Sequence, residues 1–203
     1  MSLEDRYAGQ MGQLLGPDFP TEIGLAVSGG GDSMAMLALT HGWARTFGVG
    51  LRVATIDHGL RAGSRAEAVM VAEECATLGH SHDILDWAWD GQGNLQDAAR
   101  RARLALLGRW RGAVRHVLFA HTRDDQAETL LMRLIRGSGV DGLAAMAPVR
   151  EVVDGSGRWH VVRPLLEENR ADLRHYIRTL KVPFANDPTN DDPSYDRVRV
   201  RQA

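Results

Sequence analysis

Short aliphatic and β-branched runs recur along the chain, separated by longer segments in which apolar residues return every three or four positions. The short runs predict strands, and the longer segments predict amphipathic helices. The expected strands are Glu22 to Val27, Leu51 to Ile56, a weaker one at Ile84 to Trp89, and His116 to Ala120. Alternation at this spacing predicts an α/β fold with a doubly wound, mostly parallel sheet that carries helices on both faces.

Polar residues mark where several of the expected helices begin. Ser64, followed by Glu67, has the spacing of a capping box, and Asn94 and Asn169 are suited to cap two later helices. Another amphipathic helix is indicated by Ala127, Leu130, Leu131 and Leu134. Before the last helix, the polar segment Glu151 to Trp159, which contains two glycines, predicts a hairpin or loop.

Composition narrows the class of protein. At 203 residues the chain has room for one α/β domain, and we expect residues 1–203 to form a single domain. A hydrophobic content of 44%, a charged content of 25% and a net charge of −2 are those of a soluble globular protein without a global basic field. No apolar run is long enough for a membrane span, and the single cysteine excludes an internal disulfide, so a cytoplasmic protein with no membrane partner is expected.

The segment Ser28-Gly29-Gly30-Gly31-Asp32-Ser33 lies between the first expected strand and the helix that follows it. Glycines let the backbone approach an anion closely, and the free amides of a helix N-terminus point toward it. The hydroxyls of Ser28 and Ser33 add donors. A carboxylate such as Asp32 is unusual in an anion site, and a divalent cation bound to the phosphates, such as Mg²⁺, would explain its presence.

The spacing of this loop separates three kinds of phosphate site. A Walker loop needs a lysine, and the only lysine in the chain is Lys181. A dinucleotide fingerprint needs a third glycine where Met34 stands. The remaining pattern, Ser-Gly-Gly-x-Asp-Ser, resembles the pyrophosphate loop (PP-loop) of N-type ATP pyrophosphatases, which cleave ATP between its α and β phosphates and adenylate a substrate. A glycine-rich turn without a ligand is the alternative, and two serines and an aspartate beside three glycines disfavour it.

Polar residues also follow the other expected strands, at the edge of the sheet where ligands bind in this fold class. The second strand ends at Asp57 and His58, and the fourth ends at His121. His121 is either a phosphate donor or a structural histidine. Asp125 and Glu128 are three residues apart at a helix start, so they share a face. They either hold an ammonium group or favour the helix dipole, and their spacing does not decide between these roles.

Several motifs together resemble the N-terminal catalytic domain of the tRNA(Ile)-lysidine synthetases. The matching segments, in the family's order, are Ser28 to Ser33, Ile56 to Arg61, Asn94 to Arg103, His121 to Thr129, Arg133 to Gly139, Arg163 to Leu166 and Asn186 to Asn190. They cover most of residues 22–201. The PP-loop alone indicates only the superfamily, whereas Asp-Asp-Gln-Ala-Glu-Thr and Arg-Gly-Ser-Gly together are much more specific.

The resemblance implies a reaction and its partners. In that family ATP activates carbon 2 of the wobble cytidine of tRNA(Ile), the side-chain amine of free L-lysine attacks, and AMP leaves. Carried over residue by residue, it implies ATP and Mg²⁺ at Ser28, Gly29, Gly30, Gly31, Asp32 and Ser33, adenosine at Asp57 and His58, the reacting phosphate at His121, and lysine at Asp125 and Glu128. Arg100 and Arg103 would reach phosphate or the adenylated intermediate, although a solvated helix face is the alternative. Arg133 and Arg136 would position tRNA phosphates or pair with local acids.

Two positions depart from the family pattern: Thr122 stands where a second histidine is common, and Val198 stands where asparagine is usual. Longer family members continue into tRNA-binding regions, so we expect residues 186–203 to begin a linker. A tRNA thiolase is an alternative that the lone Cys75 disfavours, because such thiolation often needs paired cysteines. A regulatory nucleotide-binding module without chemistry is a second alternative, and the sequence leaves a homodimer open.

Overall fold

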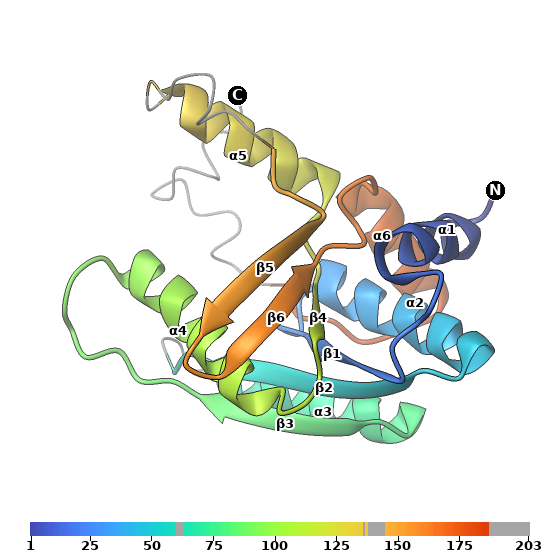
Figure 1. Ribbon diagram of the computed structural model, residues 1–203, viewed down its shortest axis with the longest axis horizontal. Helices are drawn as coiled ribbons and strands as arrows, with labels where there is room; N and C mark the ends of the chain where they lie inside the picture. The colour runs from blue at the N-terminus through green and yellow to red at the C-terminus, as the bar shows by residue number, and fades with distance from the viewer. Residues whose placement is uncertain (60–62, 136, 138–144, 187–203) are drawn as a thin grey trace.

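A six-stranded sheet forms the centre of the molecule (Figure 1). The computed structural model describes residues 1–59, 63–135, 137 and 145–186. The strands are β1 (Glu22–Ala26), β2 (Gly50–Asp57), β3 (Ser81–Asp86), β4 (His116–Phe119), β5 (Val149–Asp154) and β6 (Gly157–Val162). Their spatial order is β3-β2-β1-β4-β6-β5, and all neighbours are parallel except β5 and β6, which form an antiparallel hairpin.

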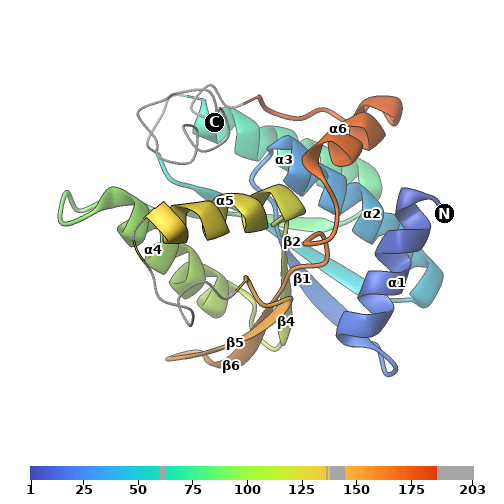
Figure 2. The same ribbon diagram turned by 90° about the horizontal axis from the view of Figure 1, so that it is seen from above.

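Helices cover both faces of this sheet (Figure 2). They are α1 (Leu3–Leu15), α2 (Gly31–Phe47), α3 (Ser64–Leu78), α4 (Leu95–Trp110), α5 (Arg123–Ile135) and α6 (Arg170–Thr179). The larger hydrophobic core packs α1, α2, α3 and α6 against one face, with side chains such as Met11, Leu37 and Ile177 at its centre. The smaller core packs α4 against the other face around Leu107 and Trp159. The expected doubly wound α/β fold is therefore confirmed.

The order of the strands explains where a site can form. From β1 the chain runs outward to β2 and β3, and it then returns across the sheet to place β4 on the other side of β1. Helices α2 and α5 follow the carboxyl ends of these two neighbouring strands. Such a reversal opens a crevice at the carboxyl edge, which is where doubly wound sheets bind ligands.

Most elements follow the sequence expectations, with two corrections and one omission. The third strand spans Ser81–Asp86 rather than Ile84 to Trp89, because its parallel register with β2 ends where Asp86 pairs with Asp57. Ser64 does not cap its helix: Gly63 is the N-cap, and the Ser64 hydroxyl bonds to Asp57 instead. The sequence patterns considered above did not predict α1, although Ser2 and Asp5 form a capping box there.

The expected hairpin and the other two caps are confirmed. Strands β5 and β6 turn at Gly155, while Asn94 and Asn169 accept hydrogen bonds from the backbone of their helices' first turns. Helix α5 also forms as expected, but it projects beyond the sheet, and its apolar stripe is largely exposed (Figure 1). None of the described helices combines the length and the apolarity that crossing a bilayer requires.

Candidate functional site

The glycine-rich loop joins β1 to α2 at the carboxyl edge of the sheet. Gly29 has a φ of +86°, a left-handed conformation that favours glycine. The N-cap Gly30 contributes no side-chain cap, so the first amides of α2 have no partner from that side chain. The Ser33 hydroxyl donates to the Gly30 carbonyl oxygen at 2.8 Å and lies 3.2 Å from the Ser28 hydroxyl. The loop is thus held open as a cradle of backbone donors.

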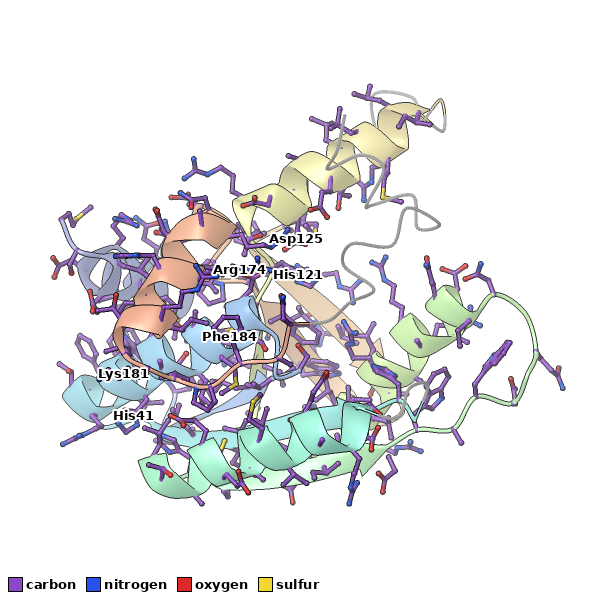
Figure 3. The ribbon with its side chains drawn as sticks, turned by 180° about the vertical axis from the view of Figure 1, so that it is seen from behind. His41, His121, Asp125, Arg174, Lys181 and Phe184 are labelled. Atoms are coloured by element: carbon purple, nitrogen blue, oxygen red, sulfur yellow. The ribbon has the colours of Figure 1, made fainter. Side chains whose placement is uncertain are left out.

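The segment after α6 returns to the same loop. The Ala185 amide donates to the Gly29 carbonyl oxygen at 2.8 Å, and Gly30 and Ala185 form a parallel bridge. A Cβ added at Gly31 would lie 3.5 Å from both Arg174 and Phe184, so this glycine lies against α6 and the segment after it. Figure 3 shows Phe184 and Arg174 beside the N-terminal turn of α2.

Asp32, in the first turn of α2, has two carboxylate oxygens in different surroundings. Oδ2 accepts a hydrogen bond from Arg170 Nε at 2.9 Å, whereas Oδ1 is buried and has no hydrogen-bond partner among the described residues. Burial raises the pKa of Asp32, and the bond to Arg170 opposes that shift. Oδ1 is therefore an acceptor that still lacks a donor or a cation.

Thr122 and Asp125 form a capping box at the start of α5. The Thr122 amide and hydroxyl both donate to Asp125 Oδ2, at 2.8 and 2.9 Å, and the Asp125 amide approaches the Thr122 hydroxyl at 3.4 Å. The Thr122 side chain is fully buried. Thr122, which departs from the family's histidine, therefore orients one of the two carboxylates expected to hold an ammonium group.

Arg170 joins the PP-loop aspartate to both of those carboxylates. Its Nη2 lies 3.3 Å from Asp125 Oδ1, its Nη1 lies 3.3 Å from Glu128 Oε1, and its Nε bonds to Asp32. The Arg170 side chain is 16% exposed, and the three acids are also largely buried. Burial lowers the pKa of Arg170, but the hydrogen bond and the attraction of the acids outweigh it and hold that pKa above its ordinary value.

Asp32, Asp125 and Glu128 are suited to a cation that phosphate helps to bind, rather than to a metal ion held by protein side chains alone. Within the described part of the chain, no three His, Cys, Asp or Glu side chains are arranged to hold a metal ion by themselves. The buried Oδ1 of Asp32 is nevertheless a carboxylate oxygen without a hydrogen-bond partner, beside a cradle of amides. Mg²⁺ commonly takes one or two carboxylates together with substrate phosphates, so the donor set suits it.

Asp57 is the last residue of β2, which neighbours β1, and His58 directly follows it. The carboxylate of Asp57 accepts from the Ser64 hydroxyl at 2.6 Å and from the Gly59 amide at 3.0 Å, and these bonds hold its pKa below the ordinary value. His58 meets the ring of Trp87 edge-on at 5.4 Å. Burial lowers the pKa of His58, so the ring is neutral at pH 7. Asp57 thus shapes the turn, and the neutral, half-buried ring of His58 lies beside it.

Arg100 and Arg103 lie one turn apart on α4. Arg103 is close enough to His58 to contribute to the lowering of its pKa. Arg100 has the same effect on Arg163, a buried residue at the end of β6, whose pKa burial lowers to about 10. Arg103 therefore influences His58 and Arg100 influences Arg163, and the phosphate-directed role of both arginines stays a prediction.

The remaining predicted residues lie on or beside α5. His121 is stacked on Phe119, with ring centroids 6.0 Å apart, and Figure 3 places it close to Asp125. Arg133 lies in the last turn of α5, and Arg136 lies outside the described residues. The structure thus brings Asp32, Asp125 and Glu128 together, and it leaves the tRNA-directed role of Arg133 a prediction.

Arg170 and Arg174 are the site residues that sequence reasoning missed. Arg174 lies one turn after Arg170, contributes to the electrostatic surroundings of Asp32, and has a buried Nε without a partner among the described residues. One signal was available for Arg170. It directly follows the predicted cap Asn169, and a cation at the first position of a helix is disfavoured by the dipole unless acids surround it.

Comparisons with known proteins give a matching family model and several similar relatives. A family model described as the PP-loop domain matches residues 3–203. A tRNA(Ile)-lysidine synthase from Ruegeria pomeroyi is 53% identical over 190 residues, which are 91% of this chain and 44% of that protein. A tRNA(Ile)-lysidine synthase from a Bradyrhizobium species is 48% identical over 182 residues, 87% of this chain and 50% of that protein. The chain spans about half the length of the relatives it matches.

A solved structure shows the same fold with a different sequence. The U34-tRNA thiolase NcsA from Methanococcus maripaludis, with its [4Fe-4S] cluster, superposes with a TM-score of 0.78 at 16% sequence identity. The match covers 98% of this chain and 71% of that one. At this identity the likeness shows the shared α/β architecture alone.

Proposed function

Because the chain belongs to the PP-loop domain family, we propose that it carries the catalytic site of a tRNA(Ile)-lysidine synthetase. ATP adenylates the oxygen at carbon 2 of the wobble cytidine in the CAU anticodon of tRNA(Ile), and PPi is released. The side-chain amine of free L-lysine then forms the carbon–nitrogen bond, and AMP leaves with the oxygen. The names and the identities of the relatives support this activity, which belongs to a protein about twice as long as this chain.

The observation that carries the proposal is the contact between the PP-loop and a two-acid face. Asp32, which is adjacent to the phosphate cradle, shares the guanidinium of Arg170 with Asp125 and Glu128. A ligase of this kind needs its phosphate site and its amine site close enough for the amine to reach the carbon that adenylation activates, because catalysis here is mostly positioning. A cation-binding pair of buried carboxylates next to the cradle meets that need.

The nucleotide would lie along the carboxyl ends of β1 and β2. The amides of Gly29 to Ser33 and the Ser28 hydroxyl would donate to the phosphates, and Arg174 would add a guanidinium from α6. The Ser33 hydroxyl would hold the cradle through the Gly30 carbonyl oxygen. His58 borders the adenosine. When bound, Mg²⁺ at Asp32 would neutralise charge that develops on the transferred phosphate. Asp57 would border the adenosine with His58, from a turn that its own carboxylate holds through Ser64 and Gly59.

The amine would be held by Asp125 and Glu128. A buried carboxylate pair attracts the lysine ammonium, and one carboxylate accepts a proton as the nitrogen becomes a nucleophile. His121 donates to the reacting phosphate, and Arg100 and Arg103 stabilise the adenylated intermediate from α4. Arg133 and Arg136 would contact tRNA phosphates. Residues 1–203 would then be one catalytic domain, with residues 186–203 leading toward tRNA-binding regions.

A tRNA thiolase is the less favoured function. Cys75 is the only cysteine of the chain and is fully buried in the larger core, where burial raises the pKa of its thiol to about 12. A thiol with this pKa is protonated at neutral pH and does not act as a nucleophile or a cluster ligand. The side chain therefore serves packing.

The proposal is tested by separating adenylation from amine transfer. With tRNA(Ile) and ATP but no lysine, the protein should form the adenylated tRNA and release PPi, and lysine addition should then release AMP. A regulatory module would bind ATP and release neither product. PPi release that depends on sulfide instead of lysine would contradict the proposed substrate while keeping the adenylation chemistry.

A further inference from the structure

Arg170 holds the two acids that the proposed function assigns to the lysine amine. Each guanidinium nitrogen faces a different carboxylate: Nε faces Asp32, Nη2 faces Asp125 and Nη1 faces Glu128. These partners lie 138, 45 and 42 residues away in sequence. One guanidinium is therefore shared by three carboxylates that would otherwise repel one another.

The three contacts differ in length. The bond to Asp32 measures 2.9 Å, which is normal for a charge-assisted hydrogen bond, whereas the contacts with Asp125 and Glu128 both measure 3.3 Å. The amine-binding acids thus make the looser contacts with Arg170. Asp125 has no second oxygen to offer, because Thr122 occupies its Oδ2. An incoming ammonium therefore needs the Asp125 oxygen that Arg170 already contacts.

The backbone of Arg170 is fixed, whereas its long side chain can reorient. It is the first residue of α6, its predecessor Asn169 caps that helix, and its amide donates to Asp124 Oδ2 at 2.9 Å. The helix dipole disfavours a cation at this position, so the acids alone keep the guanidinium where it is. A competing anion within reach of the side chain can move it without unfolding the helix.

The nucleotide phosphates would be such an anion. The phosphate cradle lies at the start of α2, beside Asp32, and Arg170 makes its shortest contact with Asp32. A guanidinium can bind two phosphate oxygens at once. We propose that Arg170 is a positioning residue that occupies Asp125 and Glu128 until nucleotide phosphates draw its guanidinium away, so that nucleotide binds before lysine. The order rests on the proposed function only for the identity of the amine.

Calorimetric titration of lysine, with and without a non-hydrolysable ATP analogue, tests this order. We expect the analogue to raise the affinity of the wild-type protein for lysine about tenfold, within the usual range of coupling between two sites. Arg170→Gln should bind lysine equally well in both conditions. Arg178→Gln, an exposed arginine later on the same helix, is the matched control and should keep the wild-type response.

Loss of Arg170 removes a cation that three largely buried carboxylates share, so folding must be checked by circular dichroism. Arg170→Lys keeps the charge and loses the three-way contact, and it should show a reduced response to the analogue. The wild-type protein gives an independent readout. The ¹⁵N–¹H resonance of Arg170 Nε, assigned by comparison with Arg170→Lys, should shift when the analogue alone is added, because the bond to Asp32 is exchanged for phosphate.

The outcomes distinguish a failure of the proposed binding order from a failure of the proposed function. If the analogue does not change the affinity of the wild-type protein for lysine, the proposed binding order is wrong, while the proposed lysine site is retained. An unchanged Nε resonance, or a wild-type response in both Arg170 variants, would also overturn it. Absence of lysine binding to every variant, with and without the analogue, would overturn the proposed lysine site itself.

Discussion

At the scale of single residues, the site contains carboxylates whose pKa values are shifted in opposite directions by their surroundings. Asp57 is hydrogen-bonded by Ser64 and Gly59, and its pKa lies below the ordinary value. Asp32 is more buried, its pKa is raised, and one of its oxygens has no partner among the described residues. The hydrogen bonds of Asp57 therefore favour its ionised form, while Asp32 is suited to gain a cation or a donor when a ligand arrives.

Asp32→Asn should abolish PPi formation. The amide keeps the shape of the side chain but removes the charge that would hold Mg²⁺ on the phosphates, and we expect the rate to fall roughly 100-fold or more. Release of PPi from ATP and tRNA(Ile) measures this effect. Asp97→Asn removes an exposed acid from the first turn of α4 and is the control. Normal PPi release by the Asp32 variant would rule out the metal role.

Glu128→Gln should impair the use of lysine much more than the use of ATP. The Glu128 side chain is 5% exposed, and a charge-assisted hydrogen bond contributes about 1.5–3 kcal/mol, so the KM for lysine should rise roughly 10- to 100-fold. The KM for ATP should change little. Kinetics with each substrate varied separately measure both values. Equal losses for the two substrates would mean that Glu128 has only a structural role.

At the scale of elements, α6 is the helix that organises the crevice. Its N-cap Asn169 fixes the first turn, Arg170 and Arg174 face the PP-loop from that turn and the next, and Phe184 follows at the loop itself. Helix α5 contributes the opposite wall through Thr122 and Asp125. The site is therefore assembled from the starts of three helices, α2, α5 and α6, where backbone donors and short polar side chains gather.

Asn169→Ala should lower the free energy of unfolding by about 1 kcal/mol, because the Asp172 amide loses its 2.8 Å cap. Fraying of this turn also loosens Arg170, so lysine affinity without nucleotide should rise. Asn94→Ala removes the equivalent cap of α4 and is the matched control. It should lose similar stability without that rise. Denaturant unfolding and lysine titration measure both effects, and identical lysine affinities in the two variants would contradict the role given to α6.

At the scale of the whole molecule, the first helix supports a site formed near the end of the described chain. Arg6 on α1 donates to both carboxylate oxygens of Glu168, at 2.7 to 3.2 Å, and Gln10 donates to Glu167 at 2.6 Å. The Glu168 carbonyl oxygen also accepts from the Arg123 amide at the start of α5. The connection between β6 and α6 is thus held from two sides, and with it the position of Arg170.

Arg6→Gln should destabilise the protein by about 1–3 kcal/mol, because the Glu168 side chain, which is 5% exposed, loses its counter-charge. The loss stays below that of a fully buried pair because the Arg6 side chain is 34% exposed. Arg158→Gln breaks an exposed pair with Glu151 and should cost at most about 1 kcal/mol. Denaturant unfolding compares the two, and equal losses would contradict a supporting role for α1.

The fold was largely readable from the sequence because periodicity and caps are local signals. The phosphate loop was readable for the same reason, since strand, glycines and helix follow one another directly. The start of β3 was misplaced because an edge strand's limits are set by its neighbour, here β2. Arg170 was missed because its partners come from α2 and α5, and only the folded chain brings them together.

The most direct test of this account is ATP-dependent transfer of labelled lysine into acid-precipitable tRNA(Ile), with Asp32→Asn as the control. We expect label to appear only when ATP and an intact Asp32 are both present. Label that appears without ATP, or with Asp32→Asn at the wild-type rate, would contradict the role of the PP-loop. No label in the presence of AMP and PPi release would contradict the assignment of lysine as the substrate.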